Sequence, residues 1–320
     1  MAQKSGAPDV LTRQAKTAIA PLDRVKILFQ ADSPEFQKYS GRWLGVLHAG
    51  QRLVRSGGVF ALFQGHSATL LRIFPYAAIK YMAYDLMHEL LMPNRGDETS
   101  FRLFLAGSSS GVLSVFVTYP LELIRVRLAF DTNQRPQPGS LRSTILKIYR
   151  EGSSTDGTST QPRTMLSRYP ILKFYRGFSA TVLGMVPYAG TSFLVFGRCK
   201  TLMYSLFHVH DRHGNLVDAK EPLFRWRVNH TVVDLCSGAL AGAIAQTAAY
   251  PLEVVRRRQQ VGGILRPGST YRVLETARWI YQAYGLRGFF VGLGIGYMKV
   301  VPMTAISFTV WLDMKRRLGI

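Results

Sequence analysis

Three short segments of the chain place a proline, an acid and a base at the same spacing. Each has the pattern Pro-x-acid-x-x-base, and the segments run from Pro21 to Lys26, from Pro120 to Arg125 and from Pro251 to Arg256. Oppositely charged side chains at the ends of neighbouring helices form ion pairs that can break and form again. The chemistry that these residues support is therefore reversible ion pairing.

The proline of each segment explains how three helices could bring these charges together. A proline inside a helix removes a backbone donor and kinks the helix, so Pro21, Pro120 and Pro251 allow three helices to converge at one end. Ordinary helix-end ion pairs, which contribute little at a surface, are the alternative. Three copies at equivalent positions favour instead a ring of ion pairs, which would close a path that runs between the three helices. The expected pairs are Asp23 with Arg125, Glu122 with Arg256, and Glu253 with Lys26.

The same segments mark an internal repeat of about 100 residues. Downstream of each, an aromatic-rich stretch ends in Gly65, Gly177 or Gly292, and a further apolar helix candidate follows. Each repeat is thus an apolar helix, a charged turn, a short polar helix and a second apolar helix. The predicted repeats span residues 1–95, 96–210 and 228–320, with a loop insertion at 152–170 and a polar link at 208–227.

Hydropathy alone would not reveal a membrane protein here. The chain is 47% hydrophobic, yet it contains no run of 18 uninterrupted apolar residues, which argues against helices surrounded by lipid alone. Helices that line a water-filled cavity can carry polar and charged residues on one face. We therefore predict an all-α membrane protein with six transmembrane helices in three pseudo-symmetric repeats around a central cavity, with short amphipathic helices. Only about ten helix-compatible residues precede Pro21, so we expect the first helix to be truncated at its start.

Basic residues within the helix candidates point to an anionic ligand. The 40 Lys and Arg residues outnumber the 19 Asp and Glu residues, and this net charge of +21 favours nucleic acid, anionic lipid or an anionic small molecule as partner. A cation in the middle of a membrane helix is costly unless it meets water or an anion. Snorkelling, or pairing with structural acids, is the alternative. The candidate binding residues are Lys16, Arg72, Tyr76, Lys80, Gly184, Met185, Tyr188 and Lys299.

Nothing in the sequence supports an enzyme or a metal centre. Cys199 and Cys236 are the only cysteines, so neither a disulfide framework nor a C-x-x-C zinc site is possible. Gly-x-Ser-x-Gly, Walker, His-Glu-x-x-His and EF-hand patterns are absent from the sequence. His208, His210 and His213 lie in a polar stretch without an obvious fourth ligand, which favours a solvated loop. We predict a non-enzymatic protein without a cofactor or a metal.

The three Pro-x-[Asp/Glu]-x-x-[Lys/Arg] motifs in a tripartite chain resemble the mitochondrial carrier family over nearly the whole sequence. The resemblance implies that the charged ring is a gate on the matrix side, and that Gln30 and Gln260 brace it. The second repeat has Ala129 at the equivalent position and lacks a brace. The resemblance further implies three substrate contact points, at Arg72, at Gly184 with Met185, and at Lys299.

Two stretches resemble one branch of this family more closely. Residues from Ala20 to Gln30 and from Phe63 to Lys80 are similar to the coenzyme A carriers, the Graves disease carrier branch. This similarity implies alternating-access transport, with counter-exchange, of coenzyme A or a related nucleotide such as adenosine 3′,5′-diphosphate. A slot at Gly184 and Tyr188 would take the adenine ring, and the cations would hold the phosphates. A tyrosine packed at a helix interface is the alternative for Tyr188.

Membrane lipid is the second expected partner. Tyr175, Arg176 and Gly177 resemble the family's cardiolipin-binding motif, in which the amides of a helix amino terminus meet a lipid phosphate. The resemblance implies a monomer in the mitochondrial inner membrane with both termini toward the intermembrane space, although some peroxisomal proteins share this fold. On the side opposite the gate, we expect one or two weaker pairs, such as Asp85 with Lys200.

Three alternatives remain open on the sequence. The chain could carry another phosphorylated cofactor, such as ADP, ATP or thiamine pyrophosphate. It could keep the same fold without transport, as a membrane scaffold or receptor. A soluble nucleic-acid-binding protein fits the net charge alone, but the basic residues lie within helix candidates and not on one exposed patch or tail. We therefore expect no nucleic-acid partner.

Overall fold

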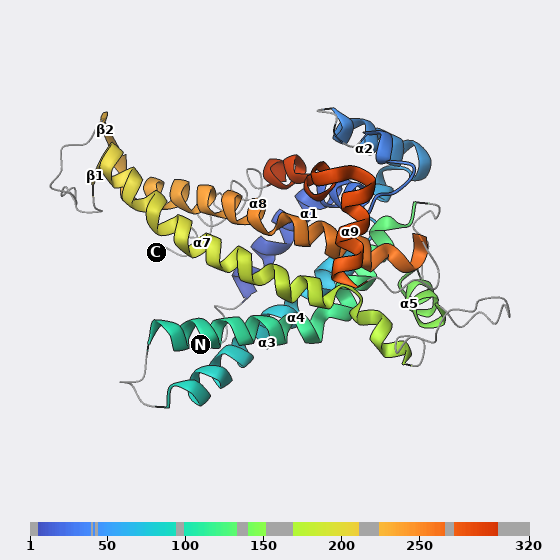
Figure 1. Cartoon of the computed structure of the whole chain (residues 1–320), viewed down its shortest axis with the longest axis horizontal. Coiled ribbons are helices and arrows are strands. Elements are labelled where there is room, and N and C mark those ends of the chain that lie inside the picture. The colour runs from blue at the N-terminus through green and yellow to red at the C-terminus, as the bar shows by residue number, and fades with distance from the viewer. Residues whose placement is uncertain are drawn as a thin grey trace. The chain divides into compact units, whose positions relative to one another are not determined.

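The structure is a computed structural model that describes residues 6–39, 41, 44–93, 99–132, 140–151, 169–210, 224–265 and 272–299. Helices dominate this part of the chain (Figure 1). The long helices are α1 (Gly6–Gln30), α3 (His66–Leu91), α4 (Ser100–Phe130), α7 (Phe178–Leu206) and α8 (His230–Leu265). The short ones are η2 (Gln37–Tyr39), α2 (Gly45–Gly57), η3 (Val59–Phe63), α5 (Ser140–Arg150), η5 (Pro170–Tyr175), α9 (Val273–Tyr284) and η6 (Gly285–Phe290).

The three signature prolines lie inside long helices. Pro21, Pro120 and Pro251 are interior residues of α1, α4 and α8, which continue beyond them and therefore carry the acid and the base of each motif on the same helix. Helix α1 has 25 residues and begins at Gly6, so more helical residues precede Pro21 than the sequence predicted. Residues 293–299 are also helical, whereas the rest of the predicted sixth helix lies outside the described residues.

Three helices among the described residues are long and apolar enough to cross a membrane. They are Phe101–Phe130, Pro170–Leu206 and Val232–Ile264, each with a mean hydropathy of 1.4 in its most apolar window. Large apolar side chains such as Phe101 and Phe193 are more than two thirds exposed on these helices. Exposed aromatic side chains on long apolar helices are typical of a surface that faces lipid. These three helices are consistent with the prediction that the chain contains membrane-spanning helices.

Landmark glycines place the second helix of a repeat against the proline helix of the next. Gly65 and Gly177 have φ values of 85° and 83°, the left-handed region that glycine adopts without strain. A Cβ atom at Gly65 would lie 2.9 Å from the carbonyl oxygen of Arg125, and one at Gly177 would lie 3.1 Å from that of Arg256. Glycine is thus required at both places for conformation and for space.

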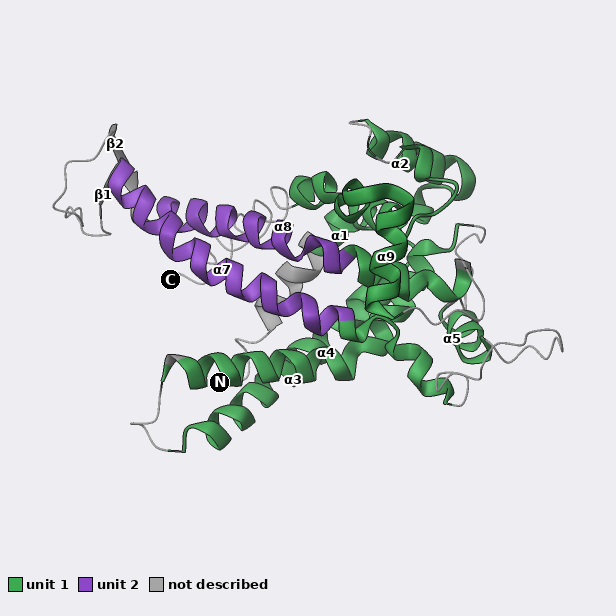
Figure 2. Cartoon of the chain, in the orientation of Figure 1, with its two compact units in different colours: residues 1–179, 254–320 green, residues 180–253 purple. Residues whose placement is uncertain are grey.

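The chain divides into two compact units, residues 1–179 with 254–320 and residues 180–253 (Figure 2). In unit 1, α3 and α4 pack along each other, and a core forms where α1, α2 and α4 meet. Leu28, Leu53 and Val126 are fully buried in that core. Burial of these apolar side chains stabilises the end of the proline helices at which the charged motifs lie.

Unit 2 contains most of α7 and the first two thirds of α8. Small residues let these helices approach closely, because a Cβ at Gly184 would lie 3.5 Å from the Cβ of Leu252. Between the helices, β1 (Phe207–His210) and β2 (Phe224–Asn229) pair in parallel. The sequence predicted a polar link at 208–227, and the two strands were not predicted. Short strands give the weak periodicity that sequence patterns resolve poorly.

Candidate functional site

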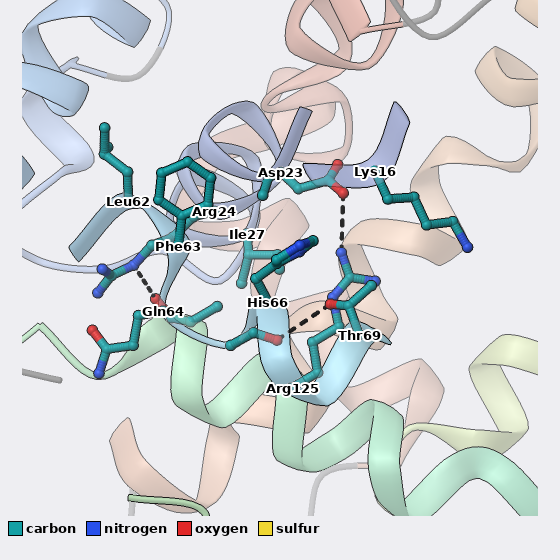
Figure 3. A pocket seen from close by; sticks show the side chains of 13 residues that line it. Lys16, Asp23, Arg24, Ile27, Leu62, Phe63, Gln64, His66, Thr69 and Arg125 are labelled. Atoms are coloured by element: carbon teal, nitrogen blue, oxygen red, sulfur yellow. Dashed lines mark hydrogen bonds and ion pairs between the residues drawn. The ribbon is translucent and has the colours of Figure 1, made fainter. Parts of the chain in front are cut away.

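The first charged pair of the ring is formed in unit 1. Nη2 of Arg125 on α4 lies 3.0 Å from Oδ2 of Asp23 on α1, as Figure 3 shows. The other oxygen of the carboxylate, Oδ1, lies 3.3 Å from Nζ of Lys299. Asp23 therefore pairs with its predicted ring partner and with a cation that the sequence assigned to the substrate.

Glu122 is the most buried acid of the ring. Its side chain is 2% exposed, and its carboxylate pairs with Arg256 at 3.0 Å and Arg257 at 2.8 Å. Arg72 of α3 is a third partner of the same carboxylate. Burying a carboxylate is expensive unless cations and hydrogen bonds compensate it, so three guanidinium groups explain how Glu122 stays charged inside the protein.

The third expected pair joins Lys26 of unit 1 to Glu253 of unit 2. Lys26 is buried near the end of α1. The pair stays a prediction, since its members belong to different units.

The predicted brace Gln260 connects α8 with α4. Its side-chain nitrogen lies 3.1 Å from the hydroxyl of Tyr119, and its side-chain oxygen accepts from Arg257 at 2.9 Å. Because Arg257 also pairs with Glu122, Gln260 is tied directly to the ring. Gln30, the other predicted brace, is fully buried at the end of α1. The role of both residues in bracing a gate remains a prediction.

Arg24 is a candidate functional residue that was not predicted from the sequence. It lies directly after the motif acid Asp23, is 2% exposed, and donates from Nε to the carbonyl oxygen of Ala129 at 3.0 Å. Its Nη2 donates to the carbonyl oxygen of Asp131 at 2.9 Å. A cation at the end of a helix satisfies its last carbonyl groups. Arg24 thus ties α1 to α4 at the position where a brace was missing.

Replacing Arg24 by Met should destabilise the junction of α1 and α4. Two hydrogen bonds from a charged donor would be lost, so we expect the thermal unfolding temperature to fall by roughly 5 °C. Thermal unfolding of the purified chain in detergent measures the effect. The matched control is Arg52→Met, because the Arg52 side chain is half exposed and lies 3.9 Å from Glu35. Equal unfolding temperatures for the two variants would contradict the proposed tie.

The mid-helix cations predicted to be free for substrate are partly engaged. Arg72 and Lys299 pair with ring acids, so the alternative considered for these cations, pairing with structural acids, is present in the structure. The physical reason is that α3 and residues 293–299 bring these cations beside the acids of the proline helices. The ring centre of Tyr76 lies 5.4 Å from the guanidinium of Arg72, so these two candidate binding residues lie on the same face of α3. Lys80 is exposed two turns farther along α3.

Lys16 lines a pocket in unit 1, near the ring (Figure 3). The same pocket is lined by Arg24, His66 and Arg125, and Asp23 is the one acid among the described residues that line it. In unit 2, Gly184 faces Leu252 of α8, which gives that glycine a packing role. The other predicted slot residues, Met185 and Tyr188, lie on the same helix, and Tyr188 is 47% exposed.

Arg176 of the expected lipid motif has its side chain engaged within the protein. Its Nη1 lies 3.0 Å from Oε2 of Glu151, and Glu151 also pairs with Arg127 of α4. Tyr175 stacks with Tyr119, and Gly177 precedes the first turn of α7. A lipid phosphate at this place would therefore meet backbone amides and not the Arg176 guanidinium, and lipid binding stays a prediction.

Two further expectations concern unit 2. Lys200 was expected to pair with Asp85, and in unit 2 its Nζ lies 2.8 Å from Oδ1 of Asp234. The described residues contain no group of three His, Cys, Asp or Glu side chains suited to a metal ion. Of the three histidines considered as metal ligands from the sequence, His213 lies outside the described residues.

Comparison with known proteins identifies the family. The family described as "Mitochondrial carrier protein" matches residues 13–95, 96–206 and 227–319. The chain belongs to the mitochondrial carrier family. It is 43% identical to the mitochondrial carrier protein LEU5 of Saccharomyces cerevisiae, over 96% of this chain and 87% of that protein. It is 34% identical to human solute carrier family 25 member 16, over 94% and 84% of the two chains.

A third relative extends the similarity to plants. The mitochondrial carrier protein CoAc1 of Arabidopsis thaliana is 32% identical over 94% of this chain and 85% of its own length. Members of the mitochondrial carrier family are transporters and not enzymes. The chain is therefore an all-α transporter of a small molecule, and it crosses the mitochondrial inner membrane several times.

Proposed function

We propose that this mitochondrial carrier transports coenzyme A, or a closely related adenine nucleotide such as adenosine 3′,5′-diphosphate, by counter-exchange. The observation that carries the proposal is the pairing of Arg72 with Glu122 and of Lys299 with Asp23. Both cations were expected to bind phosphates. Each of them pairs with a carboxylate of the ring, and a phosphate ester would compete for the same cations because it forms charge-assisted hydrogen bonds of the same kind.

The same pairing suggests how substrate could open the ring. Glu122 tolerates burial because three cations surround it. A phosphate that attracts Arg72 and Lys299 would take one cation each from the carboxylates of Glu122 and Asp23. The loss of these charge pairs would raise the free energy of the closed ring. A ligand shifts a conformational equilibrium only by binding one state more tightly than the other. In this proposal, the more tightly bound state is the one with the ring open.

The remaining parts of the proposal concern orientation and partners. The ring would lie on the matrix side and both termini would face the intermembrane space, with the protein acting as a monomer. Cardiolipin would bind beside Gly177, where the amides at the start of α7 can meet its phosphate. The adenine ring would stack on Tyr188, whose side chain is half exposed in unit 2. Lys16 and Lys80 would add positive charge to the path.

Exchange in liposomes tests the proposed substrate. The full chain would be reconstituted with coenzyme A inside, and uptake of radiolabelled coenzyme A, adenosine 3′,5′-diphosphate, ADP, ATP and thiamine pyrophosphate would be compared. We expect the first two to exchange fastest. Fast exchange of thiamine pyrophosphate without any adenine nucleotide would replace the proposed substrate, and no exchange of any compound would favour a non-transporting scaffold.

Tyr188 provides a test of adenine recognition. Tyr188→Ala should raise the KM for coenzyme A by roughly tenfold, because stacking on an aromatic ring contributes about 1–3 kcal/mol per base. Tyr188→Phe keeps the ring and should leave KM nearly unchanged. Initial exchange rates over a range of coenzyme A concentrations give both values. A wild-type KM for Tyr188→Ala would favour the alternative, a tyrosine that only packs against a neighbouring helix.

A further inference from the structure

Arg258 is a buried cation with an unusual environment near the end of α8. Its side chain is 4% exposed, and its guanidinium lies 4.9 Å from the ring centre of Trp279 and 4.8 Å from that of Tyr284. Both rings belong to α9. Aromatic faces attract a cation, but they do not neutralise its charge. A buried guanidinium of this kind requires an anion nearby.

The anion comes from the turn that follows α1. Oδ2 of Asp32 lies 3.4 Å from Nη1 of Arg258 and accepts a hydrogen bond of 2.7 Å from the hydroxyl of Tyr284. Gln37 donates to the same hydroxyl at 2.6 Å. Burial and the hydrogen bond to Asp32 raise the pKa of Tyr284, so the phenol keeps the proton that it donates.

The backbone of Asp32 supports a specific role for this side chain. Among the described residues, it is the only one other than glycine with a positive φ, at 59°. That conformation is uncommon for residues with a Cβ, although Asp and Asn tolerate it best. Such a conformation persists where surrounding contacts hold it, and here the contacts are those of the carboxylate with Arg258 and Tyr284.

The second repeat shows what this arrangement replaces. Arg127 follows the motif base of the second repeat by two residues, as Arg258 does in the third. Arg127 pairs with Glu151, the residue directly after α5. Tyr284 ends α9, the equivalent helix, so a tyrosine stands where the second repeat has an acid. The third repeat thus lacks an acid of its own at this place.

We propose that Asp32, which lies after α1 in the first repeat of the same chain, supplies the acid that the third repeat lacks. In this proposal, Asp32, Arg258 and Tyr284 are positioning residues for transport. The contacts tie the turn after α1 to α8 and α9. Arg258 lies two residues beyond Arg256, which pairs with Glu122, so the tie fixes the end of α8 that carries the ring. The proposal depends on transport by this family and not on the identity of the substrate.

A rescue experiment tests the assignment in the full chain. Asp32→Asn should lower the thermal unfolding temperature by roughly 5 °C or more and the turnover rate by about tenfold, because Arg258 loses its counter-ion. KM should change less than about twofold, since none of these side chains is placed in the substrate path. Tyr284→Glu restores an acid within the third repeat. Adding it to Asp32→Asn should therefore recover most of both losses.

Two further variants sharpen the result. Tyr284→Phe removes one hydrogen bond and keeps the ring, so it should cause a smaller loss than Asp32→Asn. Glu35→Gln is the matched control, because Glu35 follows Asp32 closely in sequence but is half exposed and lies 3.9 Å from Arg52. Unfolding temperature and turnover of the control should equal those of the wild type.

Three outcomes would overturn the proposal. The first is an Asp32→Asn protein with the stability and turnover of the control. The second is a Tyr284→Glu protein that is stable alone and fails to restore Asp32→Asn. The third is an equal loss in Tyr284→Phe and Asp32→Asn, which would mean that the hydroxyl and not the charge matters. Because unfolding is measured without any substrate, the stability part of each outcome is independent of whether coenzyme A is transported.

Discussion

Replacing Glu122 by Gln is expected to abolish exchange and to lower the thermal unfolding temperature by roughly 10 °C. The neutral amide would leave Arg72, Arg256 and Arg257 close together inside the protein without their shared anion. Removing one partner of a buried charged network costs about 3–5 kcal/mol, because the remaining charges are desolvated and unpaired. In this cluster the cations also repel one another, which adds to the cost.

Thermal unfolding in detergent and exchange in liposomes measure the two effects of Glu122→Gln. Glu35→Gln provides a control with the same chemical change at a half-exposed site. An unfolding temperature equal to that of the control would mean that the three guanidinium groups do not depend on Glu122. A stable variant with normal exchange would remove Glu122 from the transport cycle.

Replacing Arg72 by Ala should have a different signature, a large loss of exchange with little loss of stability. Glu122 would keep Arg256 and Arg257 as partners, so we expect the unfolding temperature to change by less than about 3 °C. The proposed contact with a substrate phosphate would be lost. We expect exchange of coenzyme A to fall by about 100-fold, which corresponds to about 2.7 kcal/mol.

Two comparisons separate the charge of Arg72 from its shape. Arg72→Lys keeps the charge and loses the planar fork that binds phosphate through two hydrogen bonds, so its exchange rate should lie between those of Arg72→Ala and the wild type. Arg278→Ala, on the exposed side of α9, is the control. Undiminished exchange in Arg72→Ala would show that this cation serves only the ring.

Local features of the fold could be predicted from the sequence because they depend on residues close together. The motif prolines, the acids and bases that follow them, and the landmark glycines recur in each repeat. Repetition allowed the chain to be divided and allowed Asp23 to be paired with Arg125, and Glu122 with Arg256. Both pairs are present in the structure.

Contacts between repeats were harder to predict. Arg24 donates to backbone carbonyl groups at the end of α4. Every residue has a backbone carbonyl group, so such an acceptor cannot be recognised from the sequence. Asp32 pairs with Arg258, which is far away in sequence and outside any shared motif. Arg72 and Lys299 were predicted to bind substrate, because a residue's own helix segment does not show which acids lie on neighbouring helices. Helix packing supplied acids from neighbouring helices instead.

The close approach at the landmark glycines has a consequence for how the repeats can move. Gly65 of the first repeat lies against Arg125 of the second, and Gly177 of the second lies against Arg256 of the third. Each contact joins the start of one repeat's second long helix to the base of the next repeat's motif. When Arg125 or Arg256 moves, the helix that begins beside it must move too, because there is no free space between the glycine and the backbone of the base. Movement of one repeat would then be coupled to movement of the next. A side chain added at either glycine would clash with the proline helix of the neighbouring repeat and would disturb that repeat as much as its own.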